Sequence, residues 1–232
     1  MRPLVVLFRK ELHATFTSPI AYTIATVFLL VLGYTFSLTL FATKVANLNY
    51  IFHQVYVLSL LVPVLTMRAF AEERRTDTLE LLLTAPVREI WIVLAKFLAA
   101  LSLLILMFAG SLAYAVVLGL YGDPDWGPIY SGYLAVLLNA SLLVALGLLM
   151  SSLTENQVVA AALSLGTFLM LWFADSVAYL LPQPFELFAV NLSLIGHFKP
   201  LASGEVFLSD IGYFIMLSLL ALFLTTRRLM ER

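Results

Sequence analysis

The sequence has no cysteine, and only 12% of its 232 residues are charged. The absence of cysteine excludes disulfide bonds, thiolate metal sites, iron–sulfur clusters and a thiol nucleophile. A soluble domain carries about twice this share of charge, whereas hydrophobic residues make up 62% of this chain. The formal net charge is −1, so no basic surplus favours a nucleic-acid partner. The composition therefore predicts an integral membrane protein.

Long apolar stretches predict six transmembrane helices. A helix needs about 20 mostly apolar residues to cross a hydrocarbon core of about 30 Å. Stretches that meet this length lie at approximately residues 20–41, 49–67, 97–121, 130–153, 158–181 and 206–226. No repeat or linker divides the sequence, so we expect one all-α transmembrane domain over residues 1–232.

The distribution of basic residues predicts the orientation of this domain. An even number of spans places both termini on the same side of the membrane. Eleven lysines and arginines then lie on the side of the termini, and only Lys44 and Lys199 lie on the other side. Because basic loops face the cytoplasm, we expect cytoplasmic termini and a cytoplasmic loop at residues 68–96.

Two further segments are apolar but do not fit a membrane span. Leu4, Phe8, Leu12 and Phe16 form one apolar stripe along residues 3–17, which predicts a helix lying in the inner interface. Between spans five and six, the run "LFAVNLSLIGHF" is too short to cross the membrane. We expect it to form an interfacial helix or a re-entrant pair on the outer side.

The segment "EERRTDTLELLLTAP", residues 72–86, concentrates charge in the predicted cytoplasmic loop. Nine of the 27 charged residues lie between Arg68 and Glu89. Asp77 followed by Glu80 matches an aspartate variant of the capping box, and Ala85-Pro86 supplies a stop, so the pattern predicts a short helix at 78–84. Its four leucines favour burial. They either pack under the chain's own spans and the inner leaflet, or insert into a cytoplasmic partner within a charged rim.

Four segments, in order and at similar spacing, resemble the permeases of ABC-2 type transporters. They are "FRKELHATFTSPIAYTIATVFLLVLGYTF", "FAEERRTDTLELLLTAPV" followed by "VLAKFLAAL", "LGLLMSSLTENQVVAAALS", and "HFKPLASGEVFLSDIGYF". The chain is similar in particular to the gliding-motility-associated branch, which is itself similar to the permease of nitrous oxide reductase maturation systems. One departure is Asp77, which stands where the family usually has glycine before "TLE".

The resemblance implies a non-catalytic permease subunit of the bacterial inner membrane that works as an exporter. Two permease copies, or this chain and a homologue, would pair and recruit two ABC ATPase subunits, with a periplasmic or surface protein as a further candidate partner. The short cytoplasmic helix would be the coupling helix. The expected ATPase-coupling residues are Glu72, Glu73, Arg74, Arg75, Thr78, Leu79, Glu80, Leu82, Leu83 and Pro86. The sequence has no phosphate-binding G-x-x-x-x-G-K-[ST] motif, so ATP and magnesium would bind to the partner and no cofactor to this chain.

Other functions leave fewer traces in the sequence. An ion-driven secondary transporter that acts without an ATPase is the main alternative, although such proteins carry ionisable residues near the midplane. Asp175 and Asn139 are the candidate gate or substrate-path residues, with a solvated interfacial aspartate and an interhelical amide as the simpler interpretations. His53 and His197 are weak candidates for copper ligands because no cysteine accompanies them.

Overall fold

The computed structural model describes residues 2–43, 48–84, 87–122 and 124–231, and within these ranges every regular element is a helix. The short elements at the end that holds α6 and the termini are α1 (Arg2–Phe16), α5 (Arg68–Arg75) and α6 (Thr78–Leu83). The longer helices are α2 (Pro19–Thr43), α7 (Glu89–Tyr121), α8 (Trp126–Leu153), α9 (Gln157–Ala178) and α12 (Leu208–Met230). The remaining elements are α3 (Asn49–Leu58), the 3₁₀ turn η1 (Ser59–Leu61), α4 (Val62–Thr66), α10 (Phe185–Leu192) and α11 (Leu194–Ala202).

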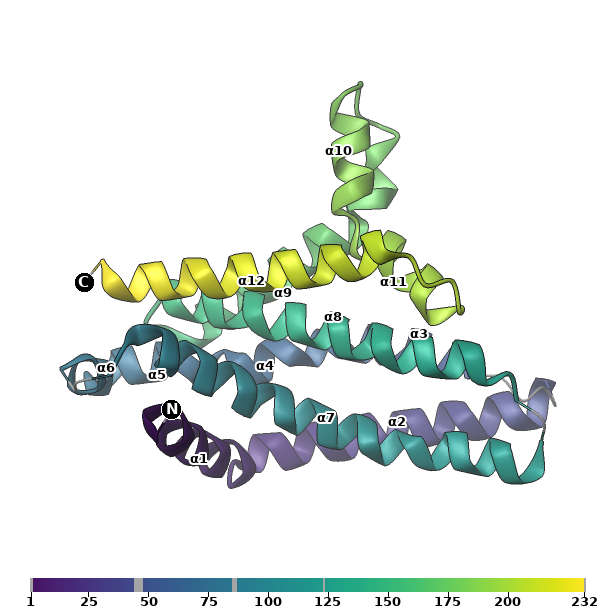
Figure 1. The fold of residues 1–232 in the computed structure, drawn as a ribbon, viewed down its shortest axis with the longest axis horizontal. Helices are drawn as coiled ribbons and strands as arrows, with labels where there is room; N and C mark the ends of the chain where they lie inside the picture. Colours follow the sequence, from purple (N-terminus) through teal and green to yellow (C-terminus); the bar gives the residue numbers. More distant parts are fainter. Residues whose placement is uncertain (1, 44–47, 85–86, 123, 232) are drawn as a thin grey trace.

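Six helical stretches in the described part of the chain are long and apolar enough to cross a membrane. They confirm the predicted all-α membrane fold, and α2, α7, α8 and α12 run along the length of the same bundle (Figure 1). Both termini and α6 lie at one end of this bundle (Figure 1). That arrangement fits an even number of spans, and the assignment of this end to the cytoplasm remains a prediction.

Five of the six helical stretches are longer than the predicted spans, whereas α9 ends at Ala178, before the predicted end at residue 181. The largest differences lie around the predicted loop 68–96. The second span continues through α3, η1, α4 and α5 to Arg75, and α7 begins at Glu89 rather than at residue 97. Hydropathy locates the apolar part of a helix, whereas the helical backbone continues wherever the residues favour it. Arginine, alanine and glutamate are good helix formers, and Glu89 lies in the positively polarised first turn of α7.

Helix α8 forms the centre of the bundle. It is the most buried of the six spans, with 61% of its most apolar window buried. Small residues let the second span approach it closely, because a Cβ atom on Gly132 would lie 2.1 Å from the Phe52 ring and one on Gly147 would lie 2.2 Å from Thr66 Oγ1. Helix α12 packs along α8, and α1 packs along α7. The core thus fixes the second span against α8.

The segment between spans five and six folds into two helices joined at Ser193, whose hydroxyl oxygen accepts a hydrogen bond from the Gly196 N–H at 3.1 Å. Helix α10 projects away from the bundle, at a large angle to α12 (Figure 1). Its Phe185, Leu187 and Phe188 side chains are exposed. This segment therefore forms two short helices and no membrane-spanning helix. Their position at the outer interface stays a prediction.

Candidate coupling site

The candidate site is the bend that joins span two to span three. Ser151 of α8 binds the start of α5, which is the first part of this bend. The Ser151 hydroxyl donates to the Met67 carbonyl oxygen at 3.0 Å and accepts from the N–H groups of Phe70 and Ala71, both at 3.1 Å. The N–H groups of a first helical turn have no acceptor within their own helix. Ser151 supplies that acceptor from a neighbouring helix, so the start of α5 is fixed to the core.

Asp77 forms the turn between α5 and α6, and the predicted capping box is wrong. Asp77 has a left-handed backbone with φ 55° and ψ 11°, and its side chain makes no capping hydrogen bond to α6. The residue therefore ends α5 rather than capping α6, as left-handed residues often do after a helix. The same geometry explains why glycine suits this position, because glycine has no Cβ to clash there. The short helix itself is confirmed, at Thr78–Leu83.

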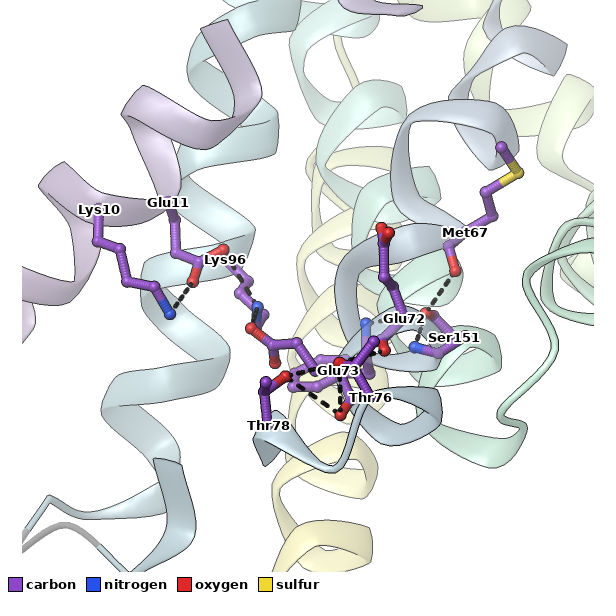
Figure 2. A network of polar contacts seen from close by, with 11 residues as sticks. Lys10, Glu11, Met67, Glu72, Glu73, Thr76, Thr78, Lys96 and Ser151 are labelled. Atoms are coloured by element: carbon purple, nitrogen blue, oxygen red, sulfur yellow. Dashed lines mark hydrogen bonds and ion pairs between the residues drawn. The ribbon is translucent and has the colours of Figure 1, made fainter. Parts of the chain in front are cut away.

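Threonine hydroxyl groups bind carbonyl oxygens at the end of α5, which differs from the capping of α6 that was predicted for the aspartate. The Thr76 hydroxyl donates to the Glu72 carbonyl oxygen at 2.9 Å and lies 2.9 Å from the Thr78 hydroxyl. The Thr78 hydroxyl also reaches the Glu73 carbonyl oxygen at 3.3 Å. Figure 2 shows these groups gathered around the turn below α5. They stiffen the connection between α5 and α6.

Lys96 of α7 links three elements next to this turn. Its Nζ lies 2.7 Å from Glu73 Oε1 on α5 and 3.1 Å from Glu11 Oε2 on α1, and its side chain is only 3% exposed (Figure 2). The Nζ also lies 5.3 Å from the centre of the Phe70 ring. A buried lysine is stable only when it is paired. The interaction therefore ties α1, α5 and α7 together at the end of the bundle that holds the termini.

The predicted coupling residues on α6 are divided between the core and the surface. Leu79 is 3% exposed and packs in the chain's own core, and Leu82 is partly buried against the same core. Thr78 and Glu80 are exposed. Of the two alternatives for the leucines, packing under the chain's own spans therefore holds for Leu79, and that side chain offers no surface to a partner. The side chains of Leu81 and Leu83, and all of Pro86, lie outside the described part of the structure.

The remaining coupling residues lie on α5. Glu73 takes part in the Lys96 pair, and Arg74 is buried. Glu72 is partly buried and Arg75 is exposed. Arg74 also lines a hollow of about 480 Å³ together with Asp77, Glu80, the Glu155 turn between α8 and α9, and the end of α12. The structure thus divides the predicted residues, with Arg74 and Glu80 at this hollow and Glu72, Glu73 and Thr78 at a second hollow beside Lys96.

Sequence reasoning did not identify Lys96, Glu11 or Ser151 as members of this site. The signal that could have identified Lys96 is its place in "IWIVLAKFLAAL", where one lysine lies in an apolar helix and needs a carboxylate partner. Glu11 is the matching acid on the amphipathic first helix. Ser151 gave no specific signal, because small residues are common in membrane bundles.

The two candidate gate residues lie apart from this bend. Asn139 is buried in α8 and its Nδ2 donates to Ser59 Oγ at 3.4 Å, which confirms an interhelical amide. Asp175 is partly buried near the end of α9. No hydrogen bond joins the two side chains among the described residues. Their role in a gate or substrate path remains untested.

His197 does not offer a ring nitrogen to a metal. Its Nδ1 lies 2.8 Å from Asp210 Oδ1 and its Nε2 lies 3.1 Å from the Asn191 carbonyl oxygen. Both ring nitrogens are therefore already in contact with oxygen atoms of the chain. No group of three or more potential metal-binding side chains occurs in the described ranges.

The fold and the site define a multi-pass helical membrane protein with a rigid polar bend next to both termini. The profile of the ABC-2 family transporter proteins matches residues 6–211, which is most of the chain. The chain therefore belongs to the ABC-2 family of membrane transport subunits, which work with an ABC ATPase. A search of curated proteins found no match.

Proposed function

We propose that this chain is the permease subunit of an ABC-2 exporter, in which a separate ATPase hydrolyses ATP and moves the spans through the α5–α6 bend. The observation that carries the proposal is the attachment of this bend to three other helices. Lys96 pairs with Glu73 and Glu11, while Ser151 binds the start of α5. A displacement of α6 would therefore act on α1, α7 and α8 together.

The exposed residues of α6 and the adjacent turn are the proposed contact with the ATPase. Asp77, Thr78 and Glu80 are exposed, whereas Leu79 anchors the helix from within. A helix held by a buried leucine and a hydroxyl network transmits force better than a loosely tethered one, because packed elements move as units. This division of roles supports a coupling function for the helix.

The wider assembly is part of the same proposal. Two permease copies, or this chain and a homologue, pair in a bacterial inner membrane and bind two ATPase subunits, which carry ATP and magnesium. The apolar helices of the chain favour export of an apolar or amphipathic substrate over an ion. Mechanical work on a periplasmic or surface apparatus is the other role included in the proposal. The chain itself contributes no catalytic group.

The test is co-purification of an ABC ATPase with this chain when it is expressed together with its neighbouring genes. Glu80→Lys reverses an exposed charge on α6, and Glu186→Lys makes the same change on α10, far along the chain from the bend. We expect Glu80→Lys to reduce the bound ATPase about tenfold, because an unfavourable charge at an interface costs more than 1 kcal/mol. Glu186→Lys should leave the amount unchanged.

Undiminished ATPase binding by Glu80→Lys would contradict the coupling surface. Thermal unfolding of both variants in detergent establishes that each is folded before the comparison. Transport by the lone chain in proteoliposomes under an ion gradient, without ATP, would instead establish the ion-driven alternative.

A further inference from the structure

A hollow of about 430 Å³ lies beside the Lys96 site, between α1, the start of α2, α4, α5 and α7. Its lining changes from charged to apolar along two of these helices. On α7 it passes from Lys96 through Ala100 to Leu103. On the second span it passes from Glu72 through Arg68 and Thr66 to Leu65 and Val64. One end of the hollow is thus polar, and the end that points along the spans is apolar.

The polar end contains two acidic side chains on α5. Glu73 binds Lys96 through Oε1, and its Oε2 is buried and has no hydrogen-bond partner among the described residues. Glu72 lines the same hollow, and Figure 2 shows its carboxylate pointing away from the threonines and from Lys96. A buried carboxylate oxygen without a donor is costly. The hollow therefore favours a ligand that brings N–H donors and positive charge.

Lys96 binds Glu11 Oε2 and Glu73 Oε1, and among the described residues no ion pair joins it to Glu72. Arg68 is exposed and lines the same hollow, so it adds a cation next to the two acids. A ligand that fits has an ammonium group for the Glu72 carboxylate, an anionic group for the arginine, and an apolar tail for Leu65 and Leu103.

We propose that this hollow binds a phospholipid with a primary-amine headgroup of the phosphoethanolamine type. The ammonium would donate to Glu72, the phosphate would face Arg68, and the start of the acyl chains would follow the apolar end. A choline headgroup has no N–H to donate, and a glycerol headgroup has no cation. The inference goes beyond the coupling role and does not depend on an ATPase partner.

The test is lipid retention by the full-length chain purified in a mild detergent. The protein is mixed with equal amounts of phosphatidylethanolamine, phosphatidylcholine and phosphatidylglycerol of identical acyl chains, and bound lipid is counted by native mass spectrometry. We expect about tenfold more bound phosphatidylethanolamine than either other lipid, the ratio that one charge-assisted hydrogen bond produces. Equal retention of the three lipids would overturn the proposal.

Two variants locate the binding. Glu72→Gln keeps the side-chain shape and removes the charge, and it should abolish the preference for the ethanolamine lipid, whereas Glu155→Gln in the exposed α8–α9 turn should preserve it. Ala100→Leu fills the hollow and should also abolish the preference, whereas Ala113→Leu on an exposed face of α7 should not. A preference that survives in both hollow variants would place the lipid elsewhere and overturn the assignment.

A competition experiment separates the lipid from its free headgroup. Soluble O-phosphoethanolamine carries the same ammonium and phosphate without acyl chains. We expect it to leave the bound phosphatidylethanolamine in place at equal concentration. Displacement at equal concentration would show that the apolar end contributes nothing, and the lipid would no longer be the assigned ligand.

Discussion

The hydroxyl of Ser151 on α8 lies 3.0 Å from the carbonyl oxygen of Met67 and joins the most buried helix to the bend between spans two and three. The hydroxyl oxygen of Ser151 also accepts hydrogen bonds from the N–H groups of Phe70 and Ala71. One buried side chain thus takes the place of the capping residue that α5 lacks, since Met67 itself has a helical backbone and makes no capping hydrogen bond. The start of α5 depends on a residue about 80 positions later in the sequence.

Ser151→Ala removes this interhelical cap. We expect the free energy of unfolding to fall by about 1 to 2 kcal/mol, as for the loss of a strong N-cap. Ser152→Ala is the matched control, because Ser152 is equally buried but bonds to the Leu149 carbonyl oxygen of its own helix. Thermal unfolding in detergent, followed by tryptophan fluorescence, measures both. Equal decreases in Tm would show that the cap has no special role.

Gly147→Ala places a methyl group where Thr66 already lies. The added Cβ would sit 2.2 Å from Thr66 Oγ1 and 2.8 Å from Thr66 Cβ, so the second span must move away from α8. We expect a loss of about 1 to 3 kcal/mol, the usual range for overpacking. Gly166→Ala provides the comparison, since no atom lies within 4 Å of its added Cβ. A Tm for Gly147→Ala at or above that of Gly166→Ala would refute the close approach.

Lys96→Met leaves Glu11 and Glu73 without their shared cation. Because these carboxylates are largely buried, at 15% and 17% exposed, we expect a loss of about 3 kcal/mol, near the lower bound for breaking a buried pair. Lys10→Met removes the other lysine near Glu11, which is 59% exposed and 3.7 Å away, and should cost less than about 1 kcal/mol. If both variants unfold at the same temperature, Lys96 does not hold the three helices together.

Asp77→Gly relieves the left-handed backbone at the turn between α5 and α6. We expect a gain in stability of less than about 1 kcal/mol, because the cost of a left-handed conformation is partly offset by the greater freedom of glycine in the unfolded chain. Asp77→Val should lower the stability, since a β-branched side chain fits this conformation poorly. The reverse order of the two Tm values would contradict the assigned geometry.

His197→Phe keeps a ring that can stack on Tyr213, whose centre is 4.1 Å from that of the imidazole, but removes both hydrogen bonds. Asp210 is buried and would lose its partner, so we expect a cost of about 1 to 3 kcal/mol. His53→Phe makes the same change at an exposed position and should have little effect. Comparable effects of the two substitutions would argue against a structural role for the His197–Asp210 pair.

The number and type of the spans could be predicted because crossing a membrane imposes a length and a composition on each helix. The ends of the helices could not be predicted in the same way. The predicted loop 68–96 contains helical residues of α5 before α6 and of α7 after it. Asp77 shows the same limit at one residue. An aspartate three positions before a glutamate fits both a capping box and a left-handed turn, and only the backbone geometry distinguishes them.

The candidate site was partly predictable. The charged segment with its short helix lies at the end of the bundle that holds both termini, as expected, but Leu79 faces the core and Lys96 was not recognised as a member of the site. A local pattern can indicate that leucines will be buried, and it cannot indicate which surface will cover them.

The sequence by itself determined that this chain is a six-span helical membrane protein with its charge concentrated in one loop, because the bilayer and the helix period act on each segment separately. Only the tertiary structure decided that Lys96 would meet Glu11 and Glu73, and that Ser151 would cap α5. These contacts join residues 23 to 85 positions apart. Their partners are set by how the helices pack, which no local pattern specifies.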